Sequence, residues 1–166
     1  KPILDYNDYL YGAGVAVDPS YHKVKNRVIA PYLCRTEESS EYSYRTLASF
    51  LTEDWYREAK EKNVRHWTKP FYGKVGGKQI IDYQIPLHDE DGHFIGVFMV
   101  DITLEWLGTM IDSQKIYETS FIQILDGDGN EVISRGNPLP EKSSYTFTAP
   151  IDNVGWTMFI NSQEKD

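Results

Sequence analysis

The sequence contains little of what several common protein classes require. One cysteine, Cys34, occurs in 166 residues, which excludes a disulfide framework and a cluster of cysteine metal ligands. The longest apolar run, Phe94 to Val100, is far shorter than the roughly 18 residues of a membrane-spanning helix. Basic residues are also few, because 17 lysines and arginines face 25 acidic residues, giving a formal charge of −8. Nucleic acid is therefore not an expected partner, since phosphate contacts need a basic surface.

Aromatic residues are abundant, with 12 tyrosines, 7 phenylalanines and 4 tryptophans. This content is typical of a folded chain and not of a disordered one. The length suits one domain, or one domain with a small second lobe. The chain starts at Lys1, and no charged start followed by an apolar core indicates a signal peptide. We therefore expect a piece that was excised or processed from a longer protein.

Apolar runs and turn residues predict the first elements. Residues 12–17 predict a buried strand that ends at Asp18. Residues 27–32 predict a second, short strand, and Pro31 would place it at a sheet edge because proline has no amide to donate. The polar stretch 35–44 predicts a loop.

A helix is expected after these elements. Thr52 is a plausible N-cap, and Asn63 can end the helix in the left-handed conformation. Trp55 and Ala59, with Leu51 before them, have the spacing of one apolar helix side. The stretch 67–72 that follows the helix predicts an aromatic loop.

The clearest local pattern is a strand, an Asp-Gly turn and a returning strand, and it occurs twice. Strands at 79–87 and 93–102 flank Asp91-Gly92, and strands at 121–125 and 131–134 flank Asp128-Gly129. A short amphipathic helix is expected at 104–111, and a last strand pair at 145–149 and 156–160. The pattern favours two α+β lobes, each with an antiparallel sheet, joined by the short helix.

Metal-binding motifs are incomplete. Asp126, Asp128 and Asn130 match positions 1, 3 and 5 of a calcium loop, but Glu131 stands where glycine is needed and Asn137 where glutamate is needed. The acidic turn 89–92 fails similarly. Plain hairpin turns are the favoured interpretation.

The histidines His88 and His93 flank this turn, where zinc would need further ligands from Asp89 and Asp91. Exposed turn histidines are the favoured interpretation. No glycine-rich cofactor motif is complete, so we expect neither a metal nor a cofactor.

Aromatic residues with polar tips gather in the stretch that follows the predicted helix start. Such side chains suit a small-ligand pocket, although a plain hydrophobic core is the alternative. Asp101 ends an apolar strand, where it could face a ligand or cap the next helix near Thr103. The candidate ligand-binding residues are Trp55, Tyr56, Trp67, Phe71, Tyr72, Tyr83 and Asp101.

Several motifs occur in an order that resembles the double Cache sensor domains. They are Asp54-Trp55-Tyr56 with Ala59, Trp67 with Pro70-Phe71-Tyr72, Gly76-Gly77, Tyr83 with Pro86, Gly92, and Ile95-Gly96-Val97-Phe98-Met99-Val100-Asp101-Ile102. Double Cache domains are extracytoplasmic ligand-binding domains of bacterial transmembrane receptors. The residues 12–16 and the pair Gly155-Trp156 extend the resemblance over nearly the whole chain.

The resemblance implies two PAS-like Cache lobes. It assigns residues 1–112 to a membrane-distal lobe and residues 113–166 to a smaller membrane-proximal lobe. Members usually begin with a long helix from a transmembrane segment, which this chain lacks. That helix often forms the dimer contact, so a homodimer of the full-length, membrane-anchored receptor is a candidate assembly.

The resemblance also bears on the ligand. In the amino-acid-binding branch, an Arg two residues before the Trp-Tyr pair grips the ligand carboxylate, and here Glu53 occupies that position. Ala48 replaces a Tyr of the same motif, whereas the Asp that holds the ligand amine is present as Asp101. A cationic or neutral polar ligand therefore suits the sequence better than an α-amino acid.

The leading hypothesis is a sensor domain that binds a small molecule in the distal lobe and signals to a cytoplasmic output domain. It is not expected to be an enzyme. The alternative is a structural or protein-interaction module whose pocket is filled by its own aromatics. A third hypothesis, a hydrolase that uses Asp101 and Glu53 as acid and base, rests on carboxylate pairing alone.

Overall fold

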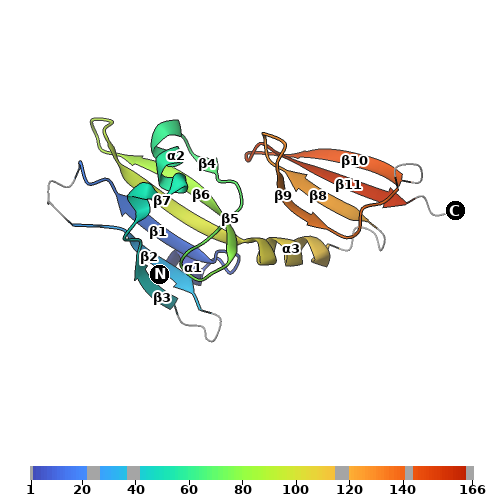
Figure 1. Cartoon of the computed structure of the whole chain (residues 1–166), viewed down its shortest axis with the longest axis horizontal. Helices are drawn as coiled ribbons and strands as arrows, with labels where there is room; N and C mark the ends of the chain where they lie inside the picture. The colour runs from blue at the N-terminus through green and yellow to red at the C-terminus, as the bar shows by residue number, and fades with distance from the viewer. Residues whose placement is uncertain (1, 22–26, 37–41, 115–119, 141–143, 164–166) are drawn as a thin grey trace. The chain divides into compact units, whose positions relative to one another are not determined.

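The computed structural model describes residues 2–21, 27–36, 42–114, 120–140 and 144–163. The chain divides into two compact units, Lys1–Thr103 and Leu104–Asp166 (Figure 1). Each unit is built on one antiparallel sheet with few helices. The predicted α+β class with two antiparallel sheets is confirmed.

The first unit contains a seven-stranded sheet in the order β3-β2-β1-β7-β6-β4, with β5 also pairing with β6. The strands are β1 (Gly12–Val17), β2 (Pro31–Arg35), β3 (Tyr42–Thr46), β4 (His66–Trp67), β5 (Phe71–Tyr72), β6 (Gln79–His88) and β7 (Phe94–Thr103). The helices are α1 (Pro2–Asp5), the 3-10 helix η1 (Phe50–Thr52) and α2 (Asp54–Lys62).

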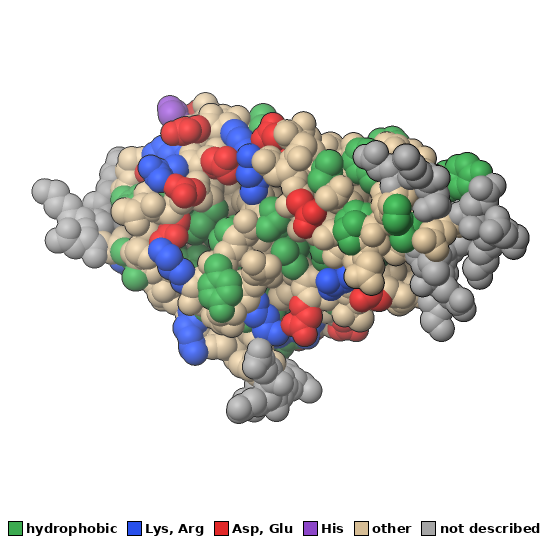
Figure 2. Space-filling view, turned by 45° about the vertical axis from the view of Figure 1, so that its right-hand side comes forward, with side chains coloured by type: hydrophobic (Ala, Val, Ile, Leu, Met, Phe, Trp, Pro, Cys, Tyr) green, Lys and Arg blue, Asp and Glu red, His purple; other side chains and the backbone are tan. Residues whose placement is uncertain are grey.

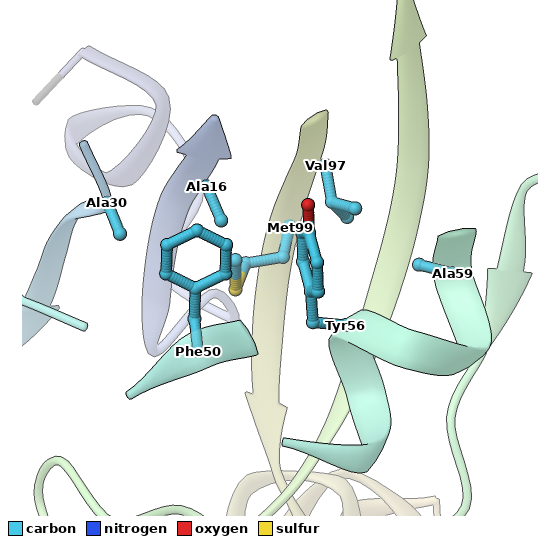
Figure 3. Close-up of a cluster of buried hydrophobic side chains, with 7 residues drawn as sticks. All are labelled: Ala16, Ala30, Phe50, Tyr56, Ala59, Val97 and Met99. Atoms are coloured by element: carbon cyan, nitrogen blue, oxygen red, sulfur yellow. The ribbon is translucent and has the colours of Figure 1, made fainter. Parts of the chain in front are cut away.

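Strand alternation gives this sheet two different faces. On one face, Leu4 and Leu10 pack against Ala13 of β1. On the other face, Phe50 of η1 and Tyr56 of α2 approach the sheet, as Figure 3 shows. The second cluster comprises Ala16, Ala30, Phe50, Tyr56, Ala59, Val97 and Met99.

The second predicted strand is shifted along the chain. Residues 27–30 are not part of a strand, and β2 starts at Pro31 and continues to Arg35. The predicted edge position is wrong, because β2 lies between β1 and β3. Proline is tolerated here because Pro31 is the first residue of the strand.

The predicted loop over 35–44 is only partly correct. Its last residues enter β3, and Arg35 belongs to β2, while residues 37–41 lie outside the described part of the chain. The sequence did not predict β3 because this strand lacks the alternation of apolar and polar residues. It is a polar strand at the edge of the sheet, and its Tyr44 is 65% exposed.

The predicted helix is present as α2, with its predicted end. Asn63 adopts a left-handed conformation with φ of 51°, and its amide bonds the Ala59 carbonyl. The N-cap is Glu53 and not Thr52, because Thr52 belongs to the preceding 3-10 helix. Leu51 also belongs to this 3-10 helix and not to α2, and its side chain is 45% exposed.

The buried side of α2 is formed by Tyr56 and Ala59. Trp55, which was expected on the apolar side, is half-buried and packs against the same core cluster. Tyr56 contacts Phe50 with ring centroids 4.7 Å apart in an edge-to-face arrangement. The helix therefore covers the sheet mainly through one tyrosine (Figure 3).

The predicted hairpin at residues 79–102 is confirmed. Strands β6 and β7 pair from Ile80↔Thr103 to His88↔Phe94, with a register shift between Leu87 and His88. Gly92 has φ of +82° at the turn, a conformation that favours glycine. The predicted aromatic loop is more regular than expected, because its ends form β4 and β5 against β6.

The second unit contains a four-stranded sheet in the order β10-β11-β8-β9. Its strands are β8 (Phe121–Leu125), β9 (Glu131–Arg135), β10 (Ser144–Ile151) and β11 (Trp156–Gln163). All four were predicted within a few residues. The predicted short helix is present as α3 (Leu104–Ser113), which follows β7 and packs against β9 of this unit. The assignment of 1–112 and 113–166 as membrane-distal and membrane-proximal lobes stays a prediction.

The described surface carries charges of both signs. On the face that Figure 2 shows, lysine and arginine side chains are interspersed with acidic ones. Among the described residues, no helix combines the length and apolar character that crossing a membrane requires.

Candidate ligand-binding site

The first unit contains a cavity of about 190 Å³ against the α2 side of its sheet. Strands β2, β6 and β7 contribute buried residues, and the other lining residues come from the segment between Thr46 and Trp55, from β5 and from the loop after β5. The lining comprises Tyr32, Thr46, Leu47, Ala48, Ser49, Phe50, Glu53, Trp55, Phe71, Tyr72, Gly73, Lys74, Val75, Ile80, Asp82, Met99 and Asp101.

Two buried aspartates belong to the polar part of the lining. Asp82 of β6 and Asp101 of β7 lie directly opposite each other in the strand register, and each is 2% exposed. The Tyr32 hydroxyl donates a hydrogen bond to Oδ2 of Asp101. Gly12 of β1 pairs with Asp101 on its other side, and a Cβ there would collide with the Tyr32 hydroxyl. The missing side chain of Gly12 therefore makes room for this bond.

Electrostatics favour one shared proton between these carboxyl groups. Burial, together with the charge of Asp101, raises the pKa of Asp82 well above its usual range. Burial also raises the pKa of Asp101 to about 6, although hydrogen bonds from Tyr32 and Asp82 oppose the rise. The Oδ1 atoms of both residues are buried and receive no hydrogen bond from a nitrogen or hydroxyl donor among the described residues. The direction of both pKa shifts therefore favours a pair that retains a proton.

An ion pair joins two parts of the lining. Lys74, in the loop after β5, places Nζ 2.5 Å from Oε1 of Glu53 at the start of α2. The Ser49 hydroxyl lies 3.3 Å from the same oxygen. The side chain of Glu53 is 20% exposed and that of Lys74 is 74% exposed, so the pair lies near the surface.

The structure brings some of the predicted site residues together. Trp55, Phe71 and Tyr72 line the cavity with Asp101. Asp101 lies inside β7 and bonds Tyr32, which contradicts the alternative that it caps α3. These aromatic residues and Asp101 thus border the same cavity.

The remaining predicted residues lie outside the lining of this cavity. Tyr56 is 2% exposed in the core, and its hydroxyl donates to Oδ2 of Asp18 at 2.7 Å. Trp67 and Tyr83 face each other across β4 and β6 with ring centroids 5.1 Å apart. Tyr83 follows Asp82 in the strand, and therefore its side chain points to the opposite face of the sheet.

Sequence reasoning missed Asp82, Tyr32 and Lys74. One signal was present, because Asp82 interrupts the apolar residues of a strand whose neighbours Ile80 and Ile81 are buried. A charged residue inside such a run indicates a paired or functional carboxylate. No local pattern marked Tyr32, which is 69 positions from Asp101 in the sequence.

In the acidic turns, an aspartate carboxylate accepts hydrogen bonds from backbone amides of the same turn. Asp89 accepts hydrogen bonds from the amides of Asp91 at 3.1 Å and His93 at 2.8 Å. Ligand atoms of these residues lie within 4.8 Å of one another. His88 bonds Asn63 at 2.8 Å. The turn hydrogen bonds support plain hairpin turns, and the expected independence of metals stays a prediction.

The same arrangement occurs at the second acidic turn. Oδ1 of Asp126 accepts the amides of Asp128 at 2.9 Å and Asn130 at 2.8 Å. Asp126 thus closes the turn through its own backbone contacts.

Solved structures with the same fold are sensor domains of receptors. The extracellular domain of mmHK1S-Z3, which is assigned as a histidine kinase, matches with a TM-score of 0.77 and 15% identity over 98% of this chain and 76% of that chain. The Pseudomonas aeruginosa PAO1 chemoreceptor PctC, in complex with GABA, matches with a TM-score of 0.62 and 15% identity over 98% and 77%. The ligand-binding domain of PctB from the same organism, in complex with L-Arg, matches with a TM-score of 0.68 and 12% identity. This match covers 99% of this chain and 69% of that chain.

A search of curated protein sequences gives no significant match. A family of sensor domains matches residues 1–109, which is most of the chain. The resemblance to Cache domains and the predicted extracytoplasmic location are confirmed by this match, because the family consists of sensor domains of receptors. The chain therefore belongs to the methyl-accepting chemotaxis protein-like family of first PDC sensor domains.

Proposed function

We propose that this chain is the ligand-binding part of a membrane-anchored receptor, and that the cavity of its first unit binds a small molecule with a positive charge. The observation that carries the proposal is the buried Asp82–Asp101 pair on the cavity lining. A buried carboxylate without a neighbouring cation is costly, and a ligand cation would relieve that cost. The aromatic residues Trp55, Phe71 and Tyr72 add apolar area and faces that attract a cation.

The charges of the lining disfavour a ligand carboxylate. The acidic groups are Glu53, Asp82 and Asp101, whereas Lys74 is the basic residue among the described lining residues. The charge of Lys74 is already paired with Glu53. The relatives PctC and PctB were solved with GABA and L-Arg, and both compounds carry an ammonium group. We therefore expect the ammonium end of such a compound to be recognised here, and the carboxylate end to be dispensable.

The size of the cavity limits the ligand. About 190 Å³ is below the ~300–1,000 Å³ typical of pockets for drug-sized molecules, so a compound of few atoms is expected. Binding would favour one conformation of the first unit, and the receptor would pass this bias to a cytoplasmic output domain. In the proposal, the first unit is the membrane-distal lobe.

Thermal unfolding of the whole chain tests this proposal with compounds matched in pairs. L-arginine is compared with agmatine, which lacks the carboxylate, and GABA is compared with propylamine. We expect the melting temperature to rise with the amines that lack a carboxylate at least as much as with their parent compounds. The Tyr83→Phe variant is a control outside the cavity lining and should respond as the wild type does. If none of the four compounds raises the melting temperature, the proposal is wrong and the self-filled module is favoured.

A further inference from the structure

We propose that the Asp82–Asp101 pair holds one exchangeable proton, and that a ligand cation displaces this proton when it binds. The inference rests on the proposed function, because it assigns a pH dependence to the same cavity. The affinity of the receptor for its ligand would then depend on pH through this one pair of side chains.

The geometry of the pair requires a proton or a cation between the two carboxyl groups. Asp82 and Asp101 are opposite in register on adjacent strands, are each 2% exposed, and belong to the same cavity lining. Tyr32 supplies one hydrogen bond to Oδ2 of Asp101. Two ionised carboxylates this close would repel each other strongly, so one proton is retained while the cavity contains no cation.

The other ionisable groups near the pair are not competitors for this proton. They are Tyr32 and Cys34 of β2, Tyr11 before β1, Glu53 before α2, and Lys74 and Lys78 before β6. Burial raises the pKa of Tyr32, Cys34 and Tyr11, so these groups stay protonated at neutral pH. Glu53 and Lys74 neutralise each other.

The exchange is balanced in charge and protons. Before binding, Asp82 is a carboxylic acid that shares its proton with the Asp101 carboxylate. When an ammonium ion enters, it donates hydrogen bonds to both carboxylates, and the proton of Asp82 leaves to the solvent. The pair carries one negative charge before binding and two afterwards, and the bound ammonium supplies one positive charge. Net charge in the cavity is therefore unchanged.

The first test needs no ligand, so it is independent of the proposed function. Infrared spectra at pH 7 should contain the C=O stretch of one protonated carboxylic acid, because exposed Asp and Glu side chains are ionised there. The band should vanish in Asp82→Asn, because this substitution removes the carboxyl group that burial holds protonated. The Glu53→Gln variant is the matched control, since it removes another lining carboxylate and should retain the band. Absence of the band from the wild-type protein at pH 7 would overturn the inference.

The second test measures the exchange. Agmatine binding is followed by calorimetry at pH 7 in buffers of different ionisation enthalpy, which gives the number of protons released. We expect release of about one proton on binding. The Kd should therefore fall about tenfold for each unit by which the pH rises, over the pH range in which the free pair retains its proton. Asp82→Asn should release none. Binding without proton release would overturn the inference and leave the proposed function intact, whereas no binding would overturn the proposed exchange and count against the proposed function.

Discussion

At the scale of single residues, the carboxylate of Asp101 is the group on which ligand recognition is expected to depend. The substitution Asp101→Asn keeps the shape and removes the charge. The affinity for agmatine should fall by about 1–3 kcal/mol, the range for hydrogen bonds to charged groups. Calorimetry measures the change, with Tyr83→Phe as the control on the opposite sheet face. A variant that binds normally but unfolds at lower temperature would show that Asp101 is purely structural.

Substitution of Tyr56 should change the stability of the fold and leave ligand affinity unchanged. Its hydroxyl donates to the buried carboxylate of Asp18 at 2.7 Å, and its ring packs on Phe50. Tyr56→Phe should therefore lower the free energy of unfolding by about 1.5–3 kcal/mol. Urea denaturation measures this loss, and ligand affinity should stay at the wild-type value. A loss of affinity at unchanged stability would restore Tyr56 to the binding site.

At the scale of elements, Asp18 connects the end of β1 to α2. Its carboxylate accepts hydrogen bonds from Tyr56, from Lys60 Nζ at 2.6 Å and from the Ser20 hydroxyl at 2.6 Å. Burial alone would raise the pKa of Asp18, but the bonds from Lys60, Ser20 and Tyr56 outweigh it and lower the pKa. The connection thus depends on the ionised form of one side chain.

This lowered pKa predicts a pH dependence with a definite sign. The unfolded chain binds the Asp18 proton more readily, so the stability from Asp18 is present above about pH 4 and is lost as pH falls. Wild-type protein should be more stable than Asp18→Asn near pH 7, and the difference should shrink below about pH 4. Urea titrations of both proteins at several pH values measure it. A difference that is constant with pH would contradict the role of the charge.

The hairpin turns should be independent of metal ions. Asp89 and Asp126 use their carboxylates to accept backbone amides inside their own turns. Chelation with EDTA should therefore leave the melting temperature unchanged. A drop of several degrees that calcium or zinc reverses would reveal a site at one of these turns.

At the scale of the whole molecule, ligand binding should stabilise the folded chain by mass action. A ligand at about one hundred times its Kd contributes roughly 2.7 kcal/mol. For a chain of this length, that corresponds to a rise of about 5–10 °C in melting temperature. Calorimetric scans at increasing ligand concentration measure the rise. A melting temperature that does not change with concentration would contradict specific binding to the folded state.

Much of the architecture followed from local sequence pattern. The hairpins at Gly92 and Gly129 were predictable because alternating strands flank Asp-Gly pairs, and both glycines have positive φ. The end of α2 at Asn63 was predictable for the same kind of reason, since few residues adopt the left-handed conformation. These features depend on neighbours in the chain.

The tertiary structure decided the site. Strand register placed Asp82 beside Asp101, Gly12 left space for the hydroxyl of Tyr32, and Lys74 reached Glu53 across the chain. Sequence alone identified Asp101, but it could not find these partners, because they come from strands and loops far apart in the chain. Long-range pairing depends on how whole elements pack, whereas turns and strand alternation depend on a few adjacent residues.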